Sequence, residues 1–201
     1  MIENEDQKPH LKHIKVSGFK SIKSLDLKMG AVNLLIGANG AGKSNFISLF
    51  TFLSQLSQGK LKTYIEQQGF ASAFFYFGTK QTSKISIALD VGINGYHVDF
   101  VHGASDDSLI FKEEYCTVTS SRRIWEVKGV RGESGLLPGS EASSSYVRQY
   151  TREYMEGCRV YHFHDTSESA GFKRANDLNA SDYLYKKANN LAPFFMISIS
   201  R

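Results

Sequence analysis

The sequence predicts an α/β domain that joins a glycine-rich strand-to-helix turn to an antiparallel β subdomain. Two observations support this fold class. An apolar run at 32–36 is followed by a glycine-rich loop and then by apolar residues at helical spacing. Further along, apolar and polar residues alternate in short segments that turn residues separate. We therefore expect a helix-bearing core over 11–69 and antiparallel strands over 70–130, with a loop, a helix, a strand and a further helix over 131–201.

The composition indicates an ordinary globular chain. Of 201 residues, 41% are hydrophobic and 22% are charged, and the net charge of +4 permits an anionic partner without requiring one. Two cysteines form no disulfide framework, and no apolar run has the length of a membrane span or a signal peptide. We expect a cytoplasmic protein with no membrane partner.

The first third of the chain is expected to supply three strands and two helices. After a solvated arm at 1–10, strands are predicted over 11–16 and 22–27, and the apolar run 32–36 is typical of a strand buried on both faces. A helix is predicted over 43–57, followed by a short helix over 60–68. The apolar residues at helical spacing are Phe46, Phe50, Leu53 and Leu56.

The rest of the chain begins with an antiparallel pattern. Residues 85–91 and 96–100 alternate apolar with polar side chains, and Asn94-Gly95 between them is a strong hairpin signal. The elements expected after this hairpin are strands near 109–111, 115–118 and 125–127, a loop over 131–145, a helix over 146–155, a buried strand over 159–163 and a helix over 181–190.

The most specific motif is Gly37-Ala-Asn-Gly-Ala-Gly-Lys-Ser44, which fits G-x-x-x-x-G-K-[ST]. Glycines allow consecutive backbone N–H groups to turn toward an anion, and the following helix adds the positive end of its dipole. Lys43 is expected to reach the β- and γ-phosphates, and the Ser44 hydroxyl is expected to bind Mg²⁺. The alternative is an ordinary glycine-rich turn. The predicted nucleotide-binding residues are Gly37, Ala38, Asn39, Gly40, Ala41, Gly42, Lys43, Ser44 and Asn45.

This motif and the residues before it resemble the N-terminal lobe of ABC-type ATPases. Phe19-Lys-Ser21, followed by 32–45, is similar to the branch that holds RecF and the heads of structural-maintenance-of-chromosomes (SMC) proteins. Segments 74–80, 161–167 and 189–192 resemble bacterial RecF-like ATPases more loosely.

The resemblance implies a P-loop NTPase fold with a β subdomain, and ATP with Mg²⁺ as ligands. It also implies that Lys20 and Ser21 lie near the nucleotide. Relatives hydrolyse ATP between two heads, so it further implies a homodimer or a complementary ATPase half as partner. DNA is a weaker expected partner, based on exposed lysines near the N-terminus.

Several parts of an ATPase of this class are not found in the sequence. Asp90 and Asp165 follow apolar segments, but neither is followed by a glutamate, and no Ser-Gly-Gly signature occurs. A half-exposed hairpin strand is the simpler interpretation of the segment ending at Asp90. A GTPase or kinase is a weaker alternative, because no guanine-recognition motif occurs. We therefore expect a truncated ATPase domain that binds ATP but hydrolyses it poorly alone; the alternative is a non-enzymatic interaction module.

Three weaker features have simpler interpretations. His162 and His164 could face a metal ion, or could be polar residues at a strand end. Residues 74–77 form an aromatic run that is expected to be core rather than a base-stacking platform. Cys116 and Cys158 are expected to be buried apolar residues.

Overall fold

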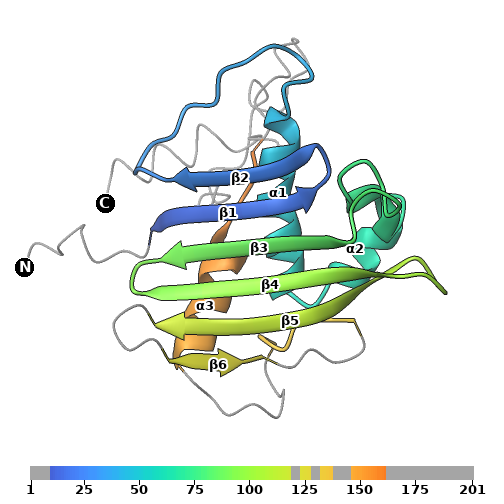
Figure 1. The fold of residues 1–201 in the computed structure, drawn as a ribbon. Coiled ribbons are helices and arrows are strands. Elements are labelled where there is room, and N and C mark those ends of the chain that lie inside the picture. Colours follow the sequence, from blue (N-terminus) through green and yellow to red (C-terminus); the bar gives the residue numbers. More distant parts are fainter. Residues whose placement is uncertain (1–9, 119–122, 128–131, 138–145, 162–201) are drawn as a thin grey trace, which may run out of the picture. The chain divides into compact units, whose positions relative to one another are not determined.

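A computed structural model describes residues 10–118, 123–127, 132–137 and 146–161, drawn in colour in Figure 1. The chain divides into two units, 1–158 and 159–201, and the fold described below is that of the first unit. Within the described residues, no helix is long and apolar enough to cross a membrane. The predicted arm, most of the predicted strand 159–163 and the predicted helix 181–190 lie outside the described residues, and Arg159 to Tyr161 form no strand.

Six strands form one antiparallel sheet in the order β2-β1-β3-β4-β5-β6. Their bounds are β1 Leu11–Phe19, β2 Ile22–Lys28, β3 Lys84–Val91, β4 Asn94–Gly103, β5 Ser108–Val118 and β6 Ile124–Glu126. The helices are α1 Lys43–Ser57, α2 Leu61–Gln67, a 3₁₀ turn at Ala71–Phe74 and α3 Tyr146–Gly157. The fold class is confirmed as α/β, and strands from both predicted parts of the domain share a single sheet.

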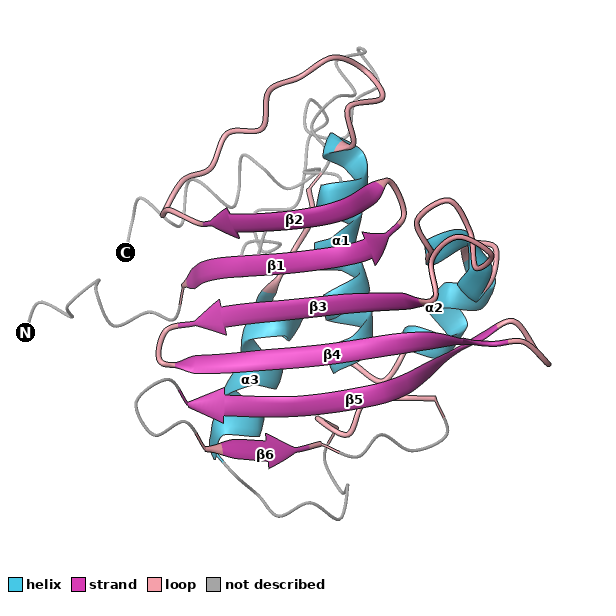
Figure 2. Ribbon diagram, in the orientation of Figure 1, coloured by secondary structure: helices cyan, strands magenta, loops and turns pink. Residues whose placement is uncertain are grey.

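Helices α1 and α3 pack across one face of the sheet, as Figure 2 shows. This face carries the apolar positions of the alternating strands, for example Ile85, Ile87 and Leu89 of β3. The ring of Phe52 from α1 lies against Phe19 of β1 at 5.5 Å between ring centroids. The other face of the sheet carries the intervening polar side chains, as expected for an antiparallel sheet covered on one side.

The hairpin of β3 and β4 is confirmed, but its predicted turn is wrong by two residues. Val91 pairs with Asn94, so the two-residue turn is Gly92-Ile93 and Asn94 already belongs to β4. Gly92 has φ +60°, the conformation that a two-residue turn with glycine first requires. The positive φ that the turn needs comes from Gly92. Asn94 and Gly95 therefore begin strand β4 instead of forming the turn.

The predicted strand at 32–36 is also wrong. These residues form no strand and pair with no other described strand, although they lead directly into the glycine-rich loop. Val32, Leu34 and Ile36 are 90%, 82% and 85% exposed. An apolar run predicts burial, but a strand also needs hydrogen-bond partners for its N–H and C=O groups, and no described strand pairs with this segment.

Two carboxylates, of which Glu114 is buried, attach the segment 132–137 to this fold. Glu114 of β5 accepts hydrogen bonds from the hydroxyl of Tyr96 (2.7 Å), the hydroxyl of Ser134 and the N–H of Gly135 (3.0 Å). Glu133 accepts from the N–H groups of Leu61 and of the next residue, at the first turn of α2. The two glutamates thus hold the segment against β5 and against the start of α2.

Candidate nucleotide-binding site

The glycine-rich loop ends where α1 begins. Gly42 is the residue before the helix and has φ +91°, a conformation that a residue with a side chain adopts at a cost. No side chain caps the helix, and its first turn holds no acidic residue. The first N–H groups of α1 are therefore left for a bound anion, which the helix dipole favours.

The side chain of Lys43 turns back over the loop. Its Nζ donates to the carbonyl oxygens of Gly37 at 2.6 Å and Ala38 at 2.7 Å. The ammonium group thus lies inside the curve of the loop, where the motif predicts a bound phosphate. Ser44, one residue further, is exposed in the first turn of α1.

The hairpin turn between β1 and β2 meets the same helix end. Phe19 pairs with Ile22, so Lys20 and Ser21 form a two-residue turn. The Ser21 hydroxyl accepts from Asn45 Nδ2 at 2.8 Å, and a Cβ added at Gly42 would lie 3.2 Å from the same hydroxyl. The fold therefore brings Ser21 and Asn45 together at the junction of loop and helix; a contact with nucleotide stays a prediction.

An open depression of about 630 Å³ adjoins this junction. Its lining residues are Lys20, Ser21, Asn45, Gln68, Ala73, Phe75, Tyr76 and Phe77. Lys20 has φ +48°, its Nζ lies 4.8 Å from the centroid of the Phe74 ring, and burial lowers its pKa.

The predicted core role of the aromatic run holds for Phe74 and Phe75 and fails for Phe77, which is 73% exposed.

The remaining candidate residues either make contacts that do not fit a catalytic role or lie outside the described residues. Asp90 is exposed at the end of β3 and accepts from His13 Nδ1 at 3.3 Å, which agrees with a half-exposed hairpin strand. Cys116 is buried, and burial raises its pKa to about 12. Cys158 is only partly buried. His162, His164 and Asp165 lie outside the described residues.

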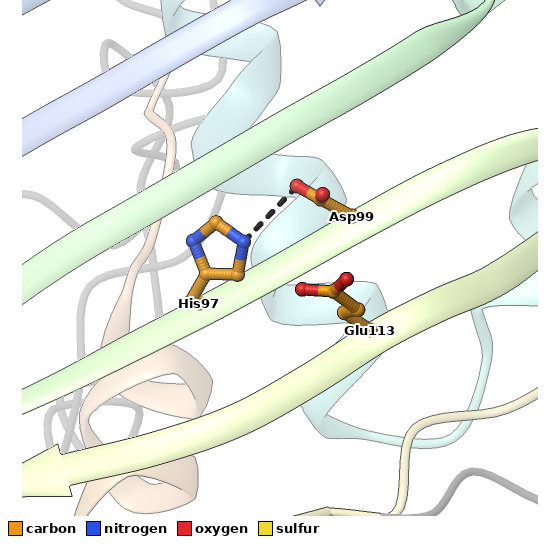
Figure 3. A group of neighbouring side chains, drawn as sticks. All are labelled: His97, Asp99 and Glu113. Carbon is orange, nitrogen blue, oxygen red and sulfur yellow. Dashed lines mark ion pairs between the residues drawn. The ribbon is translucent and has the colours of Figure 1, made fainter. Parts of the chain in front are cut away.

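One polar cluster on the open face of the sheet was not predicted from the sequence. His97 and Asp99 of β4 and Glu113 of β5 each bring a ligand-type atom within 4.8 Å of the other two, as shown in Figure 3. The signal available in the sequence was a histidine and an aspartate two apart on a strand, with a glutamate across the following hairpin.

A glycine-rich loop followed by lysine and serine at a helix start is the pattern of P-loop nucleotide-binding proteins. Residues 32–132 match the family described as "AAA domain, putative AbiEii toxin, Type IV TA system". The match spans 101 of the 201 residues, and the chain belongs to this family. The predicted P-loop ATPase class is thereby confirmed.

Two further similarities were found, and the first agrees with the predicted branch. A stretch of 55 residues, 27% of this chain, is 36% identical to the DNA replication and repair protein RecF of Paenarthrobacter aurescens (strain TC1). That stretch covers 14% of RecF. A solved structure from work titled "Structural biochemistry of ATP-driven dimerization and DNA stimulated activation of SMC ATPases" aligns with 74% of this chain and 76% of its own, at 15% identity and a TM-score of 0.34.

Proposed function

We propose that the chain binds Mg-ATP through the loop 37–42 and the start of α1. The observation that carries this proposal is the position of Lys43, whose ammonium lies on two loop carbonyls at the uncapped end of a helix. A bound phosphate would meet this ammonium together with the free N–H groups of α1. Charge-assisted bonds of this kind are among the stronger ones in proteins.

The remaining roles follow from the same geometry. The Ser44 hydroxyl would bind Mg²⁺ beside the phosphates. The depression beside Ser21 has the volume of a small-molecule site and an aromatic lining against which a base could stack. Lys20 and Ser21 would thus approach the sugar or base, and Asn45 would hold Ser21 in place through its amide.

The chain alone is proposed to bind ATP with little turnover. Hydrolysis by a P-loop ATPase needs a carboxylate for Mg²⁺ and a base for the attacking water. Among residues 10–118, 123–127, 132–137 and 146–161, no aspartate-glutamate pair follows an apolar strand, and Asp90 pairs with His13. A complementary ATPase half would supply the missing groups, and a second copy of this chain is the other proposed partner. Contact with DNA and a cytoplasmic location stay predictions.

Thermal unfolding with and without Mg-ATP tests the proposal. Ligand at 100 times its Kd stabilises the folded state by about 2.7 kcal/mol. For a chain of this size, that gain raises Tm by roughly 5–10 °C. Losing a hydrogen bond to a charged group costs about 1.5–3 kcal/mol. Lys43→Ala should then bind about 10–150-fold more weakly, so that about half to nine-tenths of the shift should disappear at the same ligand concentration.

Lys28→Ala is the matched control, because Lys28 is exposed at the end of β2. Its shift should equal that of the unchanged protein. Equal shifts in the Lys43→Ala variant and the unchanged protein would refute binding at this loop. Phosphate release by the chain alone, lost on Lys43→Ala, would refute the proposed lack of turnover.

The exposed segment 32–36 favours a second candidate function. Four large apolar side chains, Val32, Leu34, Leu35 and Ile36, are exposed directly before the glycine-rich loop. Such side chains mark docking surfaces in many proteins. A non-enzymatic module that docks on a complementary ATPase half would show no ATP-dependent shift until that half is added, which separates it from the first proposal.

A further inference from the structure

We propose that His97, Asp99 and Glu113 form a binding site for a divalent transition-metal ion, with Zn²⁺ as the best match. The site lies on the open face of the sheet, opposite α1 and α3. It is independent of the nucleotide-binding loop, so it does not rest on the function proposed above.

The strand pairing places the three side chains together. His97 and Asp99 are two residues apart on β4 and therefore point to the same face. Glu113 is the residue of β5 directly opposite Asp99, and such cross-strand neighbours lie close enough to share a ligand. The register shifts immediately after Asp99, and irregularities of this kind redirect side chains.

The atoms of the cluster are close to coordination distance. His97 Nε2 lies 3.0 Å from Asp99 Oδ1, and all three ligand atoms lie within 4.8 Å of one another. Ligands at Zn²⁺ distances in a tetrahedral site are about 3.4 Å apart. Glu113 is exposed, so its side chain is free to close the remaining gap (Figure 3).

Asp99 supplies a second observation that points to a metal ligand. The residue is only 3% exposed, yet its Oδ1 accepts no hydrogen bond, and this oxygen faces His97. A buried carboxylate oxygen without a donor is costly, and a metal ion is one of the groups that offsets this cost. The oxygen that would bind the metal is therefore the one whose contact is the ion pair to His97 and which accepts no hydrogen bond.

Neighbouring side chains hold Asp99 and His97 in position. Lys84 Nζ donates to the other Asp99 oxygen, Oδ2, at 2.7 Å. Burial opposes ionisation of Asp99, but Lys84, Ser86 and His97 together keep its pKa below the ordinary value. The imidazole of His97 stacks on Tyr115 with 4.7 Å between ring centroids. Such supporting contacts orient metal ligands in many proteins.

The ligand types select the ion. One imidazole and two carboxylates suit Zn²⁺ or a similar transition metal, whereas Mg²⁺ and Ca²⁺ prefer oxygen ligands alone. The dication would bring the local charge of Asp99, Glu113 and Lys84 from −1 to +1. Three protein ligands leave a fourth position for water or for an anionic group.

The chain offers matched controls in two other histidine–aspartate contacts. His102 Nε2 lies 2.7 Å from Asp107 Oδ1, but the Asp107 carboxylate also accepts from the N–H and hydroxyl of Ser72. His13 uses its two ring nitrogens for two different aspartates, Asp26 and Asp90. Among the described residues, only the His97 cluster gathers three such ligand atoms.

Calorimetric titration of the full chain with ZnCl₂, with Mg²⁺ in excess, tests the proposal. We expect one Zn²⁺ bound per chain, and an affinity at least about tenfold weaker in His97→Gln and in Asp99→Asn, since even supporting contacts of metal ligands change affinity 10–100-fold. His102→Gln and Lys43→Ala should bind as the unchanged protein does. Co²⁺ should give the visible absorption of a four-coordinate ion, and Glu113→Gln should weaken it.

Thermal unfolding without metal first establishes that each variant folds. Equal affinity in folded His97→Gln and in the unchanged protein would overturn the proposal, as would no Zn²⁺ binding by the unchanged protein. A loss of binding in His102→Gln that matched the loss in His97→Gln would also overturn it, because it would indicate general surface binding by histidines.

Discussion

Phe52 should contribute more to stability than any exposed aromatic residue of the chain. Its side chain is fully buried on α1 and lies 5.5–5.7 Å, between ring centroids, from the rings of Phe19, Phe74 and Phe100. Truncating a buried Phe to Ala costs about 3–5 kcal/mol, and each aromatic pair adds about 0.5–1.5 kcal/mol beyond its buried area. We expect Phe52→Ala to lower the free energy of unfolding by about 4–5 kcal/mol.

Urea unfolding followed by the fluorescence of Trp125, the single tryptophan, measures this loss. Phe52→Leu keeps most of the volume and should cost less than about 1.5 kcal/mol. Phe77→Ala is the exposed control and should stay within about 0.5 kcal/mol. A loss below about 2 kcal/mol for Phe52→Ala, at an unchanged m-value, would refute the packing of α1 on the sheet.

Two further predictions concern backbone space and a buried acid. Gly18 has φ +74°, and an added Cβ would collide with the carbonyl oxygen of Lys84, so Gly18→Ala should cost about 2–5 kcal/mol. Gly78→Ala, with φ +81° and open space around it, should cost only about 1–2 kcal/mol in the same urea assay, and equal losses would contradict the collision. Burial raises the pKa of Glu114 above its usual 4.5, so the folded state binds this proton more tightly and stability should fall as pH rises from 4.5 through the raised value. Melts across this pH range should show this fall in the unchanged protein and its absence in Glu114→Gln; parallel curves would contradict it.

Elements with strong local signals were predictable from sequence. Helix α1 is predicted at 43–57 and found at Lys43–Ser57, because one stripe of apolar residues and a glycine before the first turn specify both its face and its start. The β3–β4 hairpin follows from period-two alternation. The position of its turn could not be predicted from that alternation. Gly92 and Gly95 both permit a turn, and only the pairing of Val91 with Asn94 decides between them.

Features that depend on distant partners were not predictable in this way. The strands β1 and β3 pair across about seventy residues of sequence, and no local pattern reports that contact. The phosphate loop could be located because its chemistry is contained in eight consecutive residues. The His97, Asp99 and Glu113 cluster could not, because it exists only once β4 and β5 are in register.

The sequence prediction and the structure differ most for the segment 32–36. A strand buried on both faces would lose about 1.5–3 kcal/mol for each large apolar side chain exchanged for a polar one. In the structure, Leu34 and Ile36 are 82% and 85% exposed, so the double variant Leu34→Thr/Ile36→Thr should change stability by less than about 1 kcal/mol. The matched double variant Ile87→Thr/Leu89→Thr alters buried positions of β3 and should lose at least about 4 kcal/mol. Equal losses for the two double variants in urea unfolding would mean that 32–36 is buried in solution. A small loss for Leu34→Thr/Ile36→Thr, with an intact Mg-ATP shift, would mean that α1 and the Ser21 turn suffice to hold the phosphate loop.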